Sequence, residues 1–128
     1  MKIVIMGEPK TKKNSQRIVM CGRFPKIMPS KAYCEYEKTA VWQLAGHRVG
    51  MDKRVNVQCR YYMKTKRKVD LVNLLEATDD ILVKAGVLLD DNSNIIVSHD
   101  GSRVLLDRLC PRVEIEINEE TTEHLSEL

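Results

Sequence analysis

Four acidic residues in the middle of the chain are candidate metal ligands. Asp70 precedes a predicted helix, Glu76 lies on a polar face of that helix, and Asp90 and Asp91 follow it. A tight turn after the helix would return Asp91 to the side of Asp70. Neighbouring carboxylates repel one another unless a cation neutralises them, and oxygen-only clusters favour Mg²⁺, with Mn²⁺ as an alternative. Because such ions activate water and stabilise a leaving oxygen, a carboxylate cluster of this kind is suited to phosphodiester cleavage.

Each of these residues also has a structural explanation. Asp70 is suited to cap a helix N-terminus, where an anion complements the helix dipole. Glu76, together with Asp80 one turn later, matches the solvated face that a surface helix presents opposite its apolar stripe. Asp90 and Asp91 also suit a turn. Taken one at a time, these acidic residues therefore do not establish a metal site.

Basic residues form two clusters that suit contacts with phosphate groups. The first lies in a polar loop after the first predicted strand, and the second follows a basic strand and runs directly into Asp70. The predicted DNA contacts are Lys10, Lys12, Lys13, Arg17, Lys66, Arg67 and Lys68. A charged run is often only a solvated surface. A nuclease, however, needs positive charge for the DNA backbone and negative charge for its metal, so the adjacency of the two favours a nuclease.

The histidines and the recognised catalytic motifs add little. His99 lies beside Asp100 in a polar turn from which either side chain can approach the carboxylates, although turn formation explains both. We interpret His47 and His124 as structural or without a role. The sequence contains no P-loop or dinucleotide-binding glycine motif, and no nucleophilic triad is readable from it.

Charge is divided unequally along the 128 residues. Residues 1–68 contain 17 Lys and Arg against 4 Asp and Glu, a net +13, whereas residues 69–128 contain 4 against 14, a net −10. This asymmetry predicts a polyanion partner for the first part of the chain. No apolar run approaches the roughly 20 residues that span a bilayer. The four cysteines are too dispersed for a zinc knuckle or a disulfide framework. We therefore expect a cytoplasmic protein with reduced thiols and no membrane segment.

Hydrophobic patterns place these residues on a small α+β framework. Strands are predicted at residues 2–6, 54–64, 94–98 and 111–117, and helices begin at Ser30 and near Asn73. Residues 18–29 are predicted to form a hairpin or an irregular loop, because Gly22 and Pro25 interrupt them. The order of elements predicts one domain over residues 1–128, with a mixed sheet packed by two main helices. Residues 118–128 are expected to form a flexible acidic tail.

The stretch from Val69 to Ile96 resembles the core of the RusA-type Holliday-junction resolvases, including their phage-encoded branch. The family pattern is D-x-D-N-L-x-K, a helix that ends in K-A-G-V, and a D-D pair. The matching residues here are Asp70, Asn73, Leu74, Lys84, Ala85, Gly86, Val87, Asp90 and Asp91. The opening IMGEPKTKKNSQRI is similar to the family's first strand and basic loop. Two positions differ, since the second aspartate of the family is Val72 here and its lysine is Glu76.

This resemblance implies a homodimer that uses Mg²⁺ to resolve four-way DNA junctions by paired nicks in recombination or repair. It assigns Asp70 and Asp91 to the metal, and we hypothesise that Glu76 replaces the missing carboxylate. Lys68 and Lys84 are alternative replacements for the missing lysine. A second nuclease hypothesis changes the substrate to flaps or other branched DNA. Two alternatives are not enzymes: a branched-DNA-binding protein with a degenerate metal site, and an adaptor whose oppositely charged halves pair between subunits.

Overall fold

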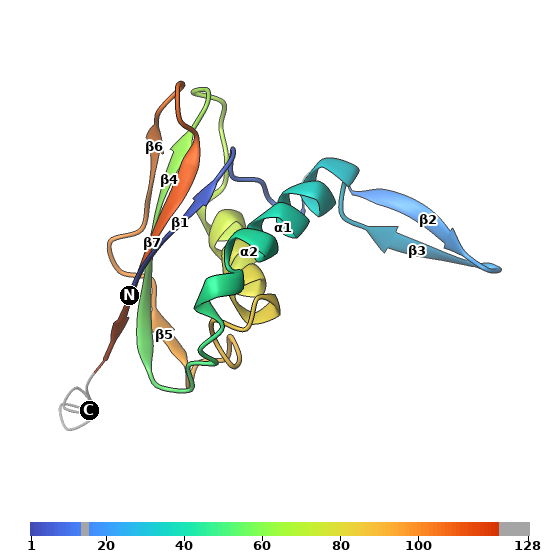
Figure 1. Cartoon of the computed structure of the whole chain (residues 1–128). Helices are drawn as coiled ribbons and strands as arrows, with labels where there is room; N and C mark the ends of the chain where they lie inside the picture. Colours follow the sequence, from blue (N-terminus) through green and yellow to red (C-terminus); the bar gives the residue numbers. More distant parts are fainter. Residues whose placement is uncertain (14–15, 121–128) are drawn as a thin grey trace.

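The computed structural model describes residues 1–13 and 16–120, which form a five-stranded sheet, two helices and a projecting hairpin (Figure 1). The strands are β1 (Lys2–Met6), β2 (Arg17–Cys21), β3 (Phe24–Met28), β4 (Val55–Met63), β5 (Ile96–Ser98), β6 (Arg103–Leu106) and β7 (Arg112–Glu119). The helices are α1 (Lys31–Gln43) and α2 (Leu71–Lys84), with a short 3₁₀ turn at Ala45–His47. The predicted single α+β domain with a mixed sheet and two main helices is confirmed.

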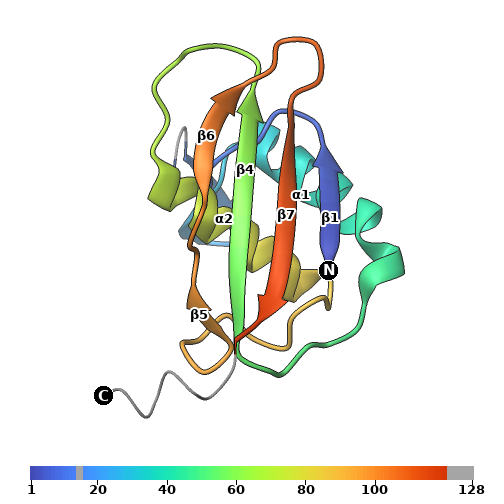
Figure 2. The same ribbon diagram turned by 90° about the vertical axis from the view of Figure 1, so that its left-hand side faces the viewer.

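The sheet is built around β4. Strand β7 pairs antiparallel with β4 on one side and with β1 on the other. Strands β5 and β6 both pair parallel with β4, β5 near its start and β6 near its end. Figures 1 and 2 show α1 and α2 on the same face of this sheet, so the opposite face of the sheet is open.

The core lies between the sheet and the two helices. The inward side chains of β4, among them Val57, Cys59 and Tyr61, are completely buried, as the alternation along this strand predicts. They pack with apolar residues of α2 such as Leu74. Burial raises the pKa of Tyr61 far above its usual range, and its hydroxyl is 2.7 Å from Thr78 Oγ1, so the buried phenol has a hydrogen-bond partner.

Local signals set the start of both helices and the end of α2. Ser30 caps α1, because its Oγ accepts a hydrogen bond from Tyr33 N at 3.1 Å. Asp70 caps α2 in the same way, as its structural explanation predicted. Gly86 follows the end of α2 with a φ of +76°, a conformation that glycine adopts without strain.

Strands β4 and β5 are one or two residues shorter at an end than predicted, and three larger differences occur. Helix α2 begins at Leu71 rather than near Asn73, since Asp70 is the cap. Strand β6 was not predicted, and it is a short edge strand without a clear apolar alternation. Strand β7 extends to Glu119 because Asn118 and Glu119 pair with the start of β4, so the first two residues of the expected tail belong to the sheet. Residues 121–128, including His124, lie outside the described residues.

Candidate functional site

Asp70 combines a structural role with accessibility. Its backbone is extended, and its Oδ1 accepts a hydrogen bond from Val72 N at 2.9 Å. The carboxylate lies at the positive end of the α2 dipole, where an anion is favourable. Asp70 is nevertheless exposed. A ligand can therefore reach the residue that also fixes the start of the helix.

The acidic face of α2 contacts the basic loop that follows β1. Lys13 Nζ is 3.1 Å from Glu76 Oε2, and Lys12 forms an ion pair with Asp80 one turn further along the helix. The Lys13–Glu76 pair is about half exposed, whereas the Lys12–Asp80 pair is more buried. The sequence predicted that Glu76 and Asp80 share a face. It did not reveal their partners, which depend on tertiary structure.

Lys12 lies within a group of charges that links the two helices. Burial lowers the pKa of Lys12, and the positive charge of Lys84 lowers it further. The carboxylates that raise it are Glu37, Glu76 and Asp91. Lys84 Nζ is itself 2.9 Å from Glu37 Oε1, and this ion pair connects α2 to α1. One of the predicted DNA contacts is therefore held against carboxylates of its own chain.

Asp90 and Asp91 lie in an exposed segment between α2 and β5, just before the turn at residues 93–95. Asp90 Oδ1 accepts a hydrogen bond from Asp91 N at 2.7 Å. The charge of Asp91 affects the pKa values of Asp79 and Lys12, so it lies beside the second half of α2. Asp70 is about 14 Å from Asp79 along the helix axis, at roughly 1.5 Å per residue. In residues 1–13 and 16–120, no three or more His, Cys, Asp or Glu side chains converge to hold a metal ion.

A buried pair next to Asp91 was not predicted. Asp79 is almost fully buried, and its Oδ2 and Oδ1 are 2.8 and 3.0 Å from His99 Nε2. Burial raises the pKa of Asp79, the hydrogen bond and charge of His99 oppose this shift, and the charge of Asp91 adds to it. The hydrogen bond to Asp79 raises the pKa of His99. The sequence suggested only that His99 can approach the carboxylates, without identifying which one.

The turn that carries His99 is fixed by one residue of the central strand. Asn56 Oδ1 accepts hydrogen bonds from Ser98 Oγ at 2.6 Å and from Asp100 N at 2.7 Å. Its Nδ2 donates to the Asp100 carbonyl at 3.2 Å. His99 therefore has a defined position next to α2. Asp100 contributes to the turn through its backbone N–H and carbonyl, which bond to Asn56.

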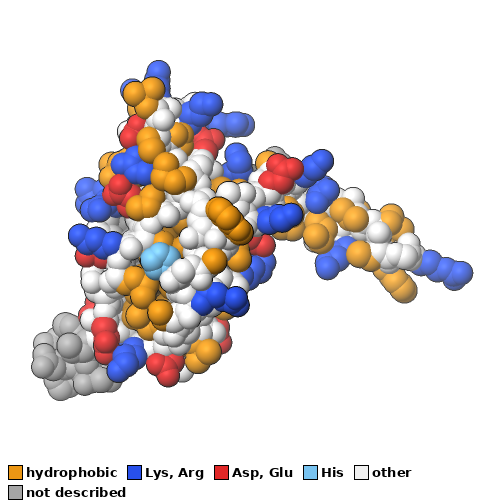
Figure 3. All heavy atoms as spheres, in the orientation of Figure 1, with side chains coloured by type: hydrophobic (Ala, Val, Ile, Leu, Met, Phe, Trp, Pro, Cys, Tyr) orange, Lys and Arg blue, Asp and Glu red, His pale blue; other side chains and the backbone are white. Residues whose placement is uncertain are grey.

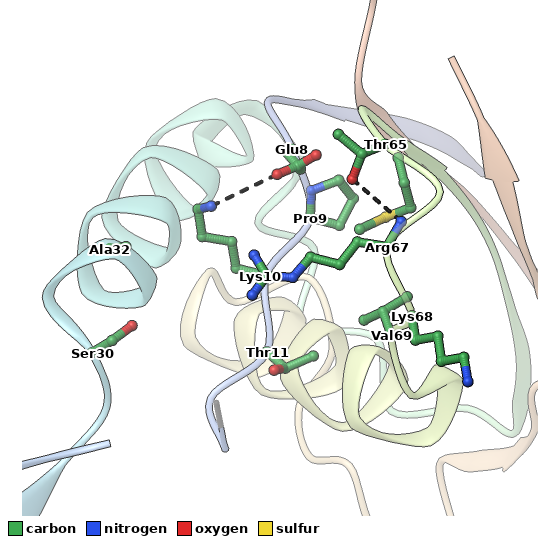
Figure 4. A pocket seen from close by; sticks show the side chains of 11 residues that line it. Glu8, Pro9, Lys10, Thr11, Ser30, Ala32, Thr65, Arg67, Lys68 and Val69 are labelled. Carbon is green, nitrogen blue, oxygen red and sulfur yellow. Dashed lines mark hydrogen bonds and ion pairs between the residues drawn. The ribbon is translucent and has the colours of Figure 1, made fainter. Parts of the chain in front are cut away.

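A basic cleft of about 480 Å³ lies beside the start of α2 (Figure 4). Its walls are the loop after β1, the start of α1 and the segment between β4 and α2. The lining residues are Glu8, Pro9, Lys10, Thr11, Ser30, Ala32, Met63, Thr65, Arg67, Lys68 and Val69. Arg67 extends across this cleft, and Lys10 reaches back toward Glu8, whose Oε1 is 4.0 Å from its Nζ. Thr11 Oγ1 is buried without a hydrogen-bond partner among the described residues.

The predicted DNA contacts therefore fall into separate places. Three of them line the cleft, namely Lys10, Arg67 and Lys68. Lys12 and Lys13 lie on the acidic face of α2. Arg17 is at the base of the hairpin, where its Nε donates to the Pro29 carbonyl at 3.1 Å, and Lys66 is exposed in the loop before α2.

Comparison with protein families gives this arrangement a context. Residues 6–118 match the family model described as endodeoxyribonuclease RusA. The chain belongs to the RusA family. No curated protein matches it.

RusA membership identifies the general chemistry. Family members are metal-dependent endodeoxyribonucleases that resolve Holliday junctions. Among the described residues, the RusA chain has no helix long and apolar enough to cross a membrane.

Proposed function

We propose that this RusA-family chain is a Mg²⁺-dependent endonuclease that introduces paired nicks into four-way DNA junctions during recombination or repair. The observation that carries the proposal is the position of the basic cleft. Its wall includes Arg67, Lys68 and Val69, and the next residue is Asp70 at the start of α2. A DNA backbone held in the cleft therefore lies next to the first candidate metal ligand.

The residues present suit a hard divalent cation. Asp70, Glu76, Asp90 and Asp91 offer only oxygen atoms, and all four are exposed. Mg²⁺ commonly keeps several waters and uses one or two carboxylates together with substrate phosphates, so a cage of three protein ligands is not required. Once bound, such an ion supplies an activated water and stabilises the leaving oxygen.

The side chains divide the remaining tasks. Asp70 would hold the ion beside the cleft. Asp91, with Asp90 and Glu76, would supply further oxygen donors along α2 that reach the ion through its bound waters or the substrate phosphates. Lys10, Arg67 and Lys68 would bind the DNA backbone through phosphate contacts that carry no sequence information. Lys13, 3.1 Å from Glu76, would place an ammonium group where the family pattern has its lysine.

The proposal includes a homodimer, as the resemblance implies. A four-way junction has two symmetric cleavage positions, and a two-fold dimer presents one copy of the site to each. Paired nicks follow from this symmetry without further specificity elements.

The decisive test uses labelled four-way junction, linear duplex and flap DNA, incubated with Mg²⁺, Mn²⁺ or EDTA. We expect symmetric nicks in the junction alone, only when a divalent ion is present, and no nicks with Asp70→Asn or Asp91→Asn. Equal cleavage of the flap would change the substrate to branched DNA in general. Cleavage that persists in EDTA would contradict the metal role.

A second candidate function is binding of branched DNA without cleavage. It is favoured by Val72, an exposed apolar residue where the family has an aspartate, and by the lysine partner that already neutralises Glu76. Binding of the junction without cleavage in either Mg²⁺ or Mn²⁺ would support this second function.

A further inference from the structure

The β2–β3 hairpin, residues 17–28, is an arm that projects from the body of the molecule at the start of α1 (Figure 1). Its strands are in register from the Arg17–Met28 pair to the Cys21–Phe24 pair. Within the described part of the chain, neither strand pairs with the main sheet. An isolated two-stranded hairpin is marginally stable in water at best. The arm is therefore an element that gains stability from a binding partner.

One face of the arm is entirely apolar. Ile18 is opposite Ile27 and Met20 is opposite Pro25, and because side chains alternate along a strand these four share a face. Ile18, Ile27 and Met20 are 73%, 68% and 62% exposed. A contiguous exposed apolar surface of this kind is typical of an interaction site.

The other face is mixed, since Arg17, Lys26 and Phe24 share it with Val19, Cys21 and Met28, and the tip carries Arg23. The arm contains Arg17, Arg23 and Lys26 and no acidic residue. Phe24, the single phenylalanine of the chain, lies at the tip beside Arg23 and is 76% exposed. Figure 3 shows hydrophobic side chains along the arm and basic side chains at its far end. Positive charge without acidic residues, combined with an exposed aromatic ring, favours a nucleic acid over a protein as the partner.

The size and position of the arm also fit DNA. Each five-residue strand spans about 17 Å at roughly 3.3 Å per residue, which exceeds the major-groove depth of about 8.5 Å. The groove also admits a two-stranded ribbon. The arm leaves from the rim of the basic cleft, because Ser30 and Ala32, which follow β3, line that cleft. DNA held in the cleft therefore passes the base of the arm, and the tip of the arm can reach the base pairs.

We propose that the arm enters the open centre of branched DNA, where Phe24 stacks on a base pair at the branch point and the Ile18 face covers exposed base surface. This proposal rests on the proposed function and identifies how the branch is recognised. Base pairs at an open branch point lack one stacking neighbour, so they offer flat apolar surface that an intact duplex hides. Apolar and aromatic side chains bind unstacked bases in this way. The arm thus sets the preference for branched over linear DNA.

The test compares Phe24→Ala with Trp42→Ala in EDTA, which prevents metal-dependent cleavage during the measurement. Trp42 is a matched control because it lies on α1 outside the arm and is 78% exposed. Dissociation constants are measured for a four-way junction and a linear duplex, with 2-aminopurine at the branch point as a reporter of stacking. We expect Phe24→Ala to lower the junction-to-duplex affinity ratio about ten-fold, which corresponds to the loss of one base–aromatic stack. It should also abolish the 2-aminopurine response, whereas Trp42→Ala should change neither.

The other results each have a defined meaning. If the wild-type chain prefers the junction and Phe24→Ala shows the same preference and the same 2-aminopurine response, the role of the arm is overturned. The proposed function is not affected by that result. A wild-type chain that binds neither DNA would overturn the proposed function as well. If Ile18→Thr with Ile27→Thr converts a dimer to a monomer in sedimentation while junction preference is retained, the arm binds a second copy of the chain and not DNA.

Discussion

The pairing of Asp79 with His99 makes the stability of the chain depend on pH, and His99→Ala tests this dependence. The pKa of His99 is raised in the folded chain by its hydrogen bond to Asp79. A raised histidine pKa gives a stabilisation that is fully present below the unfolded value of about 6.5. The stabilisation is lost as the pH rises through the higher folded pKa, because over this range the folded chain keeps a proton that the unfolded chain has released. The free energy of unfolding should therefore fall as the pH rises above about 6.5.

The size of the effect follows from the burial of Asp79. The Asp79 side chain is 12% exposed, and both of its oxygens face His99 Nε2, at 2.8 and 3.0 Å. Removing the imidazole leaves a nearly buried carboxylate without this partner, which should lower the free energy of unfolding by about 1–3 kcal/mol. We take about 2 kcal/mol because His99 is partly exposed. With an unfolding entropy of about 2.1 cal/mol/K per residue, this loss lowers the Tm of a 128-residue chain by about 7 °C.

The assay is urea and thermal unfolding at pH 6 and pH 8.5. We expect a larger difference between wild type and His99→Ala at pH 6 than at pH 8.5, and Asp79→Asn should also remove the pH dependence. His47→Ala is the control, because it removes a different histidine and leaves the Asp79–His99 pair intact. The reasoning is refuted if His99→Ala destabilises the chain equally at both pH values or not at all.

Three further substitutions test other parts of the structure. Glu76→Gln should abolish metal-dependent cleavage of the four-way junction and leave DNA binding intact, since it removes a charged ligand and not a phosphate contact; full cleavage activity would contradict the metal role. Gly101→Ala should lower the free energy of unfolding in urea by about 2 kcal/mol, because Gly101 has a φ of +85° and an added Cβ would overlap the Gln58 side chain. Gly50→Ala, at a φ of +57° but in open space, should cost less, and equal costs would refute the overlap. Lys68→Ala should weaken binding to junction and duplex alike and reduce the slope of log K against log salt by about one unit; a loss confined to the junction would exclude a backbone contact.

The parts of the fold that were predictable depend on neighbouring residues in the sequence. The alternation of apolar and polar residues from Val55 to Met63 predicts which side chains of β4 face the helices, and those side chains are buried in the structure. The cap at Asp70 and the glycine at the end of α2 are equally local signals. Strand β6 was missed because its pairing with the end of β4 stabilises four residues that carry no strand pattern of their own.

The contacts of the site were not predictable in the same way. Lys12 and Asp80 are 68 positions apart in the sequence, and they meet only because the loop after β1 crosses α2. The Asp79–His99 pair likewise depends on the return of the chain from α2 to β5 and on the turn held by Asn56. The candidate metal ligands Asp70 and Asp91 remain predictions, as do Asp90 and Glu76.

The opposed charges of the two halves of the chain partly neutralise each other within the fold. Glu114 on β7, for example, is 3.4 Å from an Arg60 nitrogen on the open face of the sheet. Lys13 pairs with Glu76 in a position that is about half exposed, and an exposed pair contributes only about 0–1 kcal/mol. A DNA phosphate can therefore replace Glu76 as the partner of Lys13 at little cost. By the same reasoning, a cation bound by Glu76 releases Lys13 for the DNA, so metal and DNA binding at this face should favour each other.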